Sequence, residues 1–110
     1  MPFLIPPKKS LGQNFLVDQN IINKIIKIAN IEKNQTILEI GAGYGNLTKK
    51  IADAEPKKIY AVEKDKKISA FLRDRFKARK NIEIINDDIF NFIKKENFGQ
   101  NIIVFGNLPY

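Results

Sequence analysis

The sequence contains neither cysteine nor histidine. The chain therefore has no disulfide, no zinc–thiolate site, no thiol nucleophile and no imidazole general base. Long apolar runs are also missing, since no stretch approaches the roughly 18 residues that span a membrane. The first ten residues, MPFLIPPKKS, hold three prolines and no basic region ahead of their apolar run, which is unlike a secretory signal. We expect a cytoplasmic protein with no membrane partner.

Acidic residues are in deficit, because 19 Lys and Arg face 12 Asp and Glu, for a formal net charge of +7. A cationic surface suits nucleic acid, since each neutralised phosphate releases condensed counterions. The alternative is a lysine-rich composition in a chain that is also rich in isoleucine and asparagine. The 44% hydrophobic content indicates one globular domain rather than disorder.

Predicted strands and helices alternate from residue 17 onward. The strands are expected within 36–43, 58–63, 81–85 and 101–106, and the helices within 17–30, 46–55, 64–76 and 88–96. This alternation predicts an α/β, Rossmann-like fold with a parallel, doubly wound sheet. The Pro-rich, basic residues 1–17 are expected to form an arm or lid, and residues 18–110 the Rossmann-like domain. Ligands of such sheets bind beyond the carboxyl ends of the strands.

Two predicted helices have specific features. The first has Asp18 as a candidate N-cap and a stripe at helical spacing made of Ile21, Ile22, Ile25, Ile26 and Ala29. The third, 64–76, is amphipathic, with one apolar face made of Ile68, Phe71, Leu72 and Phe76.

The first strand runs into a glycine turn, EIGAGYGNLT. Gly41 and Gly43 let the backbone approach a ligand, and Gly45 allows close helix packing. A dinucleotide fingerprint would require a third glycine where the chain has Asn46. The observed pattern, preceded by Glu39, suits S-adenosylmethionine better, because that cofactor has no pyrophosphate and its ammonium favours nearby oxygens.

Acidic residues follow the next two strands. Glu63 lies 22 residues after Gly41, the spacing at which a carboxylate accepts hydrogen bonds from ribose hydroxyls; the alternative is that Glu63 only caps the following helix. After the third strand, either Asp87 or Asp88 can accept from the amino group of an adenine ring, with Ile89 against the ring face and the other aspartate as an N-cap. No third oxygen ligand has suitable spacing, so we expect no metal.

The chain closes on NLPY directly after its fourth apolar run. An exocyclic purine amine is a poor nucleophile until acceptors draw its hydrogens out of the ring plane. The side-chain amide of Asn107 and the main chain at Leu108 can supply these acceptors, Pro109 stiffens the loop, and Tyr110 offers a face for a flipped base. Such catalysis relies on positioning and needs no histidine. An ordinary Asn-x-Pro turn is the alternative.

The motifs KKSLGQNFL, LEIGAGYGNLT, VEKD, NDDIF and NLPY together resemble the ribosomal RNA adenine dimethyltransferases, over nearly the whole chain. The resemblance implies methyl transfer from S-adenosylmethionine to adenine amino groups of ribosomal RNA, with the small ribosomal subunit precursor as partner. It implies that GQNFL helps to close over the cofactor. It further implies cofactor contacts from Asn14, Leu16, Gly41, Glu63, Asp88 and Asn107, and a catalytic tetrad of Asn107, Leu108, Pro109 and Tyr110.

Leu108 is more similar to the small-subunit branch than to the macrolide-resistance branch, which modifies the large subunit. Family members continue past the tetrad, so the resemblance implies that the chain is an amino-terminal piece, truncated after the fourth strand. That strand would then be an exposed edge able to mediate self-association.

Other functions stay open at this stage. A non-catalytic nucleic-acid-binding relative would keep the fold, while a DNA-adenine or protein-glutamine methyltransferase would share an Asn-Pro-Tyr-type loop without the GQNFL arm. An NAD-dependent oxidoreductase is disfavoured by Asn46. The basic stretch RDRFKARK, residues 73–80, either contacts RNA phosphates or is a solvated helix end.

Overall fold

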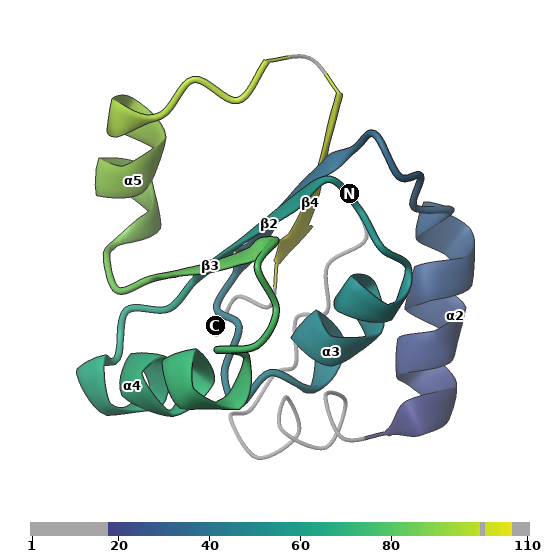
Figure 1. The fold of residues 1–110 in the computed structure, drawn as a ribbon, viewed down its shortest axis with the longest axis horizontal. Helices are drawn as coiled ribbons and strands as arrows, with labels where there is room; N and C mark the ends of the chain where they lie inside the picture. Colours follow the sequence, from purple (N-terminus) through teal and green to yellow (C-terminus); the bar gives the residue numbers. More distant parts are fainter. Residues whose placement is uncertain (1–17, 100, 107–110) are drawn as a thin grey trace.

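The computed structural model describes residues 18–99 and 101–106 (Figure 1). The predicted arm, with Asn14 and Leu16, and the tetrad, residues 107–110, lie outside the described residues. The elements follow in the order α2 (Gln19–Ala29), β1 (Thr36–Ile40), α3 (Asn46–Asp53), β2 (Lys58–Val62), α4 (Lys66–Arg75), β3 (Ile82–Ile85), α5 (Ile89–Lys95) and β4 (Ile102–Gly106).

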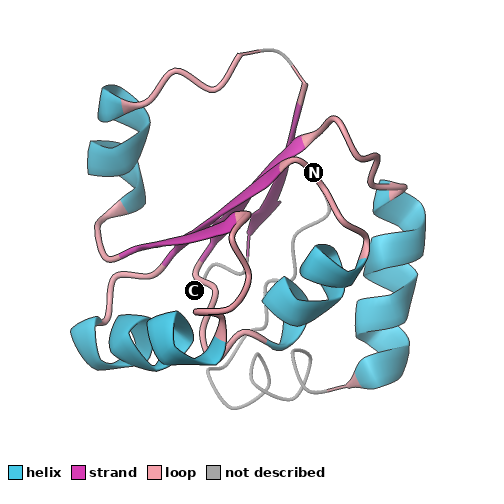
Figure 2. Ribbon diagram, viewed as in Figure 1, coloured by secondary structure: helices cyan, strands magenta, loops and turns pink. Residues whose placement is uncertain are grey.

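The described strands form one parallel sheet in the order β3-β2-β1-β4. Helices α2, α3 and α4 cover one face of this sheet and α5 lies on the other, as Figures 1 and 2 show. The predicted doubly wound α/β fold is therefore confirmed. The strand order places the strongly apolar β1 in the interior and leaves β3 and β4 as the edges of the described sheet.

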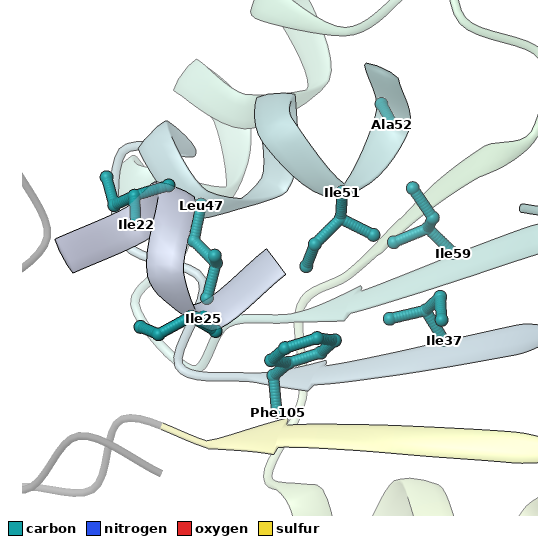
Figure 3. Close-up of a cluster of buried hydrophobic side chains, with 8 residues drawn as sticks. All are labelled: Ile22, Ile25, Ile37, Leu47, Ile51, Ala52, Ile59 and Phe105. Atoms are coloured by element: carbon teal, nitrogen blue, oxygen red, sulfur yellow. The ribbon is translucent and has the colours of Figure 1, made fainter. Parts of the chain in front are cut away.

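The main hydrophobic core lies between the sheet and helices α2 and α3. Figure 3 shows side chains from four elements around Phe105 of β4: Ile22 and Ile25 of α2, Leu47 and Ile51 of α3, Ile37 of β1 and Ile59 of β2. Alternate strand residues point the other way, so Leu38 and Val62 pack with Phe92 of α5. Burial on both faces explains why these strands are apolar runs without polar alternation.

Helix termini follow local signals. Asp18 caps α2 and accepts hydrogen bonds from the backbone of Asn20 and Ile21, as predicted. Asp65 caps α4 and Asp88 caps α5 in the same way. Helix α3 ends at Asp53, before Pro56.

The predicted buried face of α4 is correct except at Phe71. Leu72 is fully buried, Phe76 is 6% exposed and Ile68 packs against them, but Phe71 is 47% exposed. One helical residue turns the direction of a side chain by about 100°, so Phe71 cannot share the Ile68–Leu72–Phe76 stripe fully. Its ring instead packs against that of Tyr44 in a T-shaped arrangement, with centroids 5.3 Å apart.

Candidate functional site

The glycine turn between β1 and α3 requires its glycines. Gly41, Gly43 and Gly45 all have positive φ, at 72°, 60° and 92°. A Cβ on Gly45 would lie 2.6 Å from Cε2 of Phe76, so only glycine allows α4 to pack this closely. A Cβ on Gly43 would meet no atom within 4 Å, and its backbone is left open to solvent or a ligand. The close packing predicted at Gly45 is confirmed, and the ligand contact predicted at Gly43 stays a prediction.

Arg75, at the end of α4, braces the same turn. Its guanidinium donates hydrogen bonds to the carbonyl of Tyr44 and, at 3.3 Å, to Oδ1 of Asn46. Arg79 forms an ion pair with Asp53, with 3.1 Å between Nη2 and Oδ1. Lys77 also meets Asp74, with 3.5 Å between Nζ and Oδ1. Three cations of the basic stretch 73–80 thus have partners within the protein, which favours a structural role for them.

Glu63 joins the ends of β1 and β2. Its Oε1 accepts a hydrogen bond from the backbone N of Gly43 at 2.9 Å, and its Oε2 accepts one from the backbone N of Asp65 at 3.0 Å. The N-cap of α4 is Asp65, which accepts from Ile68 N at 2.9 Å. Glu63 is therefore not simply the cap of the next helix, and two predicted cofactor-binding residues are in direct contact.

The two aspartates after β3 have different surroundings. Asp88 caps α5, accepting from Phe90 N at 2.8 Å. Asp87 accepts from Asp88 N at 2.7 Å and meets Nζ of Lys95 at 3.3 Å. The backbone N–H of Asp88 and, after it, Lys95 hold the pKa of Asp87 below its usual range. Capping occupies one oxygen of Asp88, and a carboxylate has further acceptor capacity, so its contact with adenine stays a prediction. Ile89 packs beside Phe92.

Glu39 is the least expected residue of the site. It is only 3% exposed, on β1, and accepts a hydrogen bond from Oγ1 of Thr48 at 2.5 Å. Burial raises the pKa of Glu39 to about 8; the Thr48 bond opposes this shift and the charge of Glu63 adds to it. Sequence reasoning noted Glu39 as an acid beside the turn but not that it is buried. The sequence signal for this burial is an acidic residue inside the apolar run of a predicted strand.

Asn86 and Ser69 were missed altogether. Nδ2 of Asn86 donates to the carbonyls of Glu63 and Lys64, each at 3.1 Å. The hydroxyl of Ser69, which is fully buried, donates to the carbonyl of Glu63 at 2.9 Å. Their signal in the sequence is weak, because each is a common polar residue beside a more conspicuous acid.

Strand β4 ends at the same end of the sheet as β1. Gly106 pairs with Ile40, so β4 and β1 finish side by side. Asn107, Leu108, Pro109 and Tyr110 follow directly and lie outside the described residues. Within 18–99 and 101–106, no group of His, Cys, Asp or Glu has the arrangement of a metal site. No helix in that part of the chain is long and apolar enough to cross a membrane.

Comparison with known families gives this arrangement a context. The family described as "Ribosomal RNA adenine dimethylase" matches residues 6–110. The chain belongs to this family. The match includes residues 6–17 of the predicted arm and the predicted tetrad, residues 107–110, which lie outside the described residues.

Individual relatives agree with the family. Ribosomal RNA small subunit methyltransferase A of Pelagibacter ubique is 47% identical over 106 residues, which cover 96% of this chain and 39% of that protein. The chain thus spans about two fifths of the length of this curated relative.

Solved structures identify the same fold. The 23S rRNA methyltransferase ErmE superposes with a TM-score of 0.75 at 31% identity, covering 88% of this chain and 38% of that chain. A dimethyladenosine transferase from Plasmodium falciparum superposes with a TM-score of 0.68 at 30% identity, covering 84% and 33%. The sheet of this family member is therefore the Rossmann-like sheet of these methyltransferases.

Proposed function

We propose that the chain carries the cofactor-binding region of an S-adenosylmethionine-dependent enzyme that dimethylates adenines of small-subunit ribosomal RNA. The observation that carries this proposal is the hydrogen bond from Gly43 N to Oε1 of Glu63, 2.9 Å long. It joins the open glycine turn to the acid after β2, and Asp88 follows the adjacent strand β3. Family membership supports the reaction class.

Each strand end has a part in holding the cofactor. The backbone at Gly41 and Gly43 lies along the methionine moiety, and Glu63 accepts hydrogen bonds from the ribose hydroxyls. Asp88 accepts from the adenine amino group and Ile89 packs against the ring. In the arm, Asn14 and Leu16 complete the contacts.

The tetrad supplies the acceptor side of the reaction. Asn107 and the carbonyl at Leu108 accept the two hydrogens of the target adenine amine, so that its lone pair is directed at the methyl group. Pro109 keeps the loop stiff, and Tyr110 stacks on the flipped base. When bound, S-adenosylmethionine would supply the methyl group and keep the electron pair of the broken bond, and the amine would release one proton to water.

The small-subunit substrate is favoured over the large-subunit one. The relative from Pelagibacter ubique is named for the small subunit and is 47% identical, whereas ErmE, named for 23S rRNA, is 31% identical. Leu108 favours the same branch. The large-subunit reaction is the second candidate, and methylation of isolated 16S-type and 23S-type RNA fragments distinguishes the two.

Ribosomal RNA in the cytoplasm is the proposed partner. Arg73 and Lys80 are the cations of the 73–80 stretch that we assign to RNA phosphates, because Arg75, Lys77 and Arg79 have partners within the protein. Strand β4 is an edge of the described sheet, so the 110-residue chain is expected to self-associate there. A chain that stays monomeric at all concentrations in sedimentation velocity would contradict this self-association.

Calorimetric titration of S-adenosylmethionine into the chain tests the proposal, with NADH as the control ligand. Saturable binding of the first and none of the second is expected. Binding of NADH in preference would instead support a dinucleotide site.

A further inference from the structure

Asn86 is the first residue after β3, and its side chain is exposed. Its amide nitrogen donates to two consecutive carbonyls, those of Glu63 and Lys64, each 3.1 Å away. Only the NH₂ end of an asparagine can satisfy two carbonyl acceptors, so the chemistry fixes the orientation of this side chain. The exposed amide therefore ties the segment that follows β3 to the segment that follows β2.

The two tied segments carry the proposed ribose and adenine contacts. Glu63 is one of the carbonyl acceptors, and Asp88 lies two residues beyond Asn86. Apart from the backbone bond from Glu63 N to the carbonyl of Ile85, the described residues provide no other hydrogen bond between these segments. An adenosyl group holds its ribose hydroxyls and its amino group at a nearly fixed separation. Two carboxylates serve it only if their own separation matches.

We propose that Asn86 is a positioning residue that sets the distance between Glu63 and Asp88 and thereby determines recognition of the adenosyl group. This inference rests on the proposed function, because it needs the cofactor to occupy both carboxylates. Asn86 acts through the main chain of Glu63 and Lys64, so it requires no contact with the cofactor. Its effect appears in affinity more than in stability, because the side chain is exposed and buries little surface on folding.

Asn81 provides a matched control in the same pair of strands. It directly precedes β3, and its Nδ2 donates to the carbonyl of Pro56, ahead of β2, at 3.1 Å. Residue type, bond type and bond length are the same as for Asn86, but Asn81 makes one such bond where Asn86 makes two, and its bond lies at the opposite end of the sheet. Asn81→Ala therefore removes a tie of the same kind far from the proposed cofactor.

The experiment compares Asn86→Ala, Asn86→Asp and Asn81→Ala in the 110-residue chain, using calorimetric affinity for S-adenosylhomocysteine and thermal unfolding. We expect Asn86→Ala to weaken binding about tenfold and Asn86→Asp to weaken it more, since an anion would face two carbonyls. Asn81→Ala should leave affinity within about twofold of the unmodified chain, with an unfolding temperature no higher than that of Asn86→Ala. In a Glu63→Gln background, the loss from Asn86→Ala should shrink to about threefold or less, because coupled residues are not additive.

A ligand-free readout separates this inference from the proposed function. The backbone N–H of Asp65 donates to Oε2 of Glu63, so its hydrogen exchange reports whether Glu63 is held. Asn86→Ala should accelerate exchange at Asp65, and Asn81→Ala should not. If the unmodified chain fails to bind S-adenosylhomocysteine, the proposed function fails for this chain, and the exchange rates still decide whether Asn86 positions Glu63. The inference would be overturned if Asn86→Ala bound S-adenosylhomocysteine as tightly as the unmodified chain, or if Asn81→Ala lost as much affinity as Asn86→Ala. Unchanged hydrogen exchange at Asp65 in Asn86→Ala would overturn it as well.

Discussion

Carboxylates at the two ends of the sheet have different partners. At the amino ends of the strands, carboxylates face cations: Asp53 meets Arg79 at 3.1 Å, and Glu83 meets Lys58 at 3.1 Å. At the carboxyl ends, Glu63 and Asp88 accept backbone N–H groups. Asp87, which also meets Lys95, is intermediate between these cases.

This difference bears directly on ligand binding. A backbone N–H orients a carboxylate and leaves its formal charge in place, whereas an ion pair neutralises it. The carboxyl end of the sheet therefore keeps oriented negative charge in a chain whose net charge is +7. Such a site suits a cationic ligand that carries hydroxyl groups, and a sulfonium nucleoside is one. The opposite end has satisfied pairs, which are typical of structural surface.

The largest effect is expected at Glu63. Glu63→Ala removes both the proposed acceptor for the ribose and the partner of Gly43 N, so affinity for S-adenosylmethionine should fall about a hundredfold in calorimetry. Glu83→Ala, at the amino end, is the control and should change affinity by less than about twofold. Similar losses in the two variants would remove the distinction between the ends.

Substitutions at Gly45 and Gly43 should lower stability by different amounts, because only Gly45 is in close contact with a neighbouring side chain. Gly45→Ala places a Cβ against Phe76 at a φ of 92°, and we expect the free energy of unfolding to fall by about 2–4 kcal/mol in urea denaturation. Gly43→Ala meets no neighbour within 4 Å and should cost about 1 kcal/mol, from its positive φ alone. Equal costs would show that α4 does not depend on close approach at Gly45.

Glu39 should make stability depend on pH. Between its ordinary pKa of 4.5 and the folded value of about 8, the folded chain holds a proton that the unfolded chain has released. Stability from this group is complete below about pH 4.5 and is lost as the pH rises through about 8, at about 1.4 kcal/mol per pH unit in between. Glu39→Gln retains an acceptor for Thr48 and removes the titration.

Urea denaturation of Glu39→Gln at several pH values checks this expectation. Its stability should change less between pH 5 and 8 than that of the unmodified chain, and the variant should be the more stable of the two at pH 8. Parallel pH profiles for the two proteins would exclude Glu39 as the titrating group.

The smallest effect is expected for the surface pair at the amino end. Arg79→Ala should lower the free energy of unfolding by less than about 1 kcal/mol and leave cofactor affinity unchanged, because both partners are solvent-exposed. A loss of affinity would mean that the 73–80 stretch influences the cofactor site in a way that these contacts do not explain.

The sequence predicts most of the fold because its signals are local. Hydrophobic runs and the Asp18 cap act within a few residues of themselves, and the structure confirms both. The carboxyl-end location of Gly43 and Glu63 was predictable because parallel strands bring their ends together.

The remaining features depend on tertiary contacts that no short window contains. Phe71 lies outside the buried stripe, and its ring packs against that of Tyr44, which is 27 residues earlier in the sequence. The hydrogen bond from Asn86 to the carbonyl of Glu63 joins residues 23 positions apart. The buried carboxyl of Glu39 contacts Thr48 of α3, nine residues later. Neither a propensity nor a motif reports such pairings.

The central claim is that the carboxyl ends of β1, β2 and β3 form one site for an adenosyl cofactor. Titrating S-adenosylhomocysteine into ¹⁵N-labelled chain and following backbone amide shifts tests it most directly. Saturable shifts are expected at Gly43, Glu63 and Asp88, with little change at Asn81 and Lys58 at the other end of the sheet. Shifts concentrated at the amino ends, or none at saturating ligand, would contradict it.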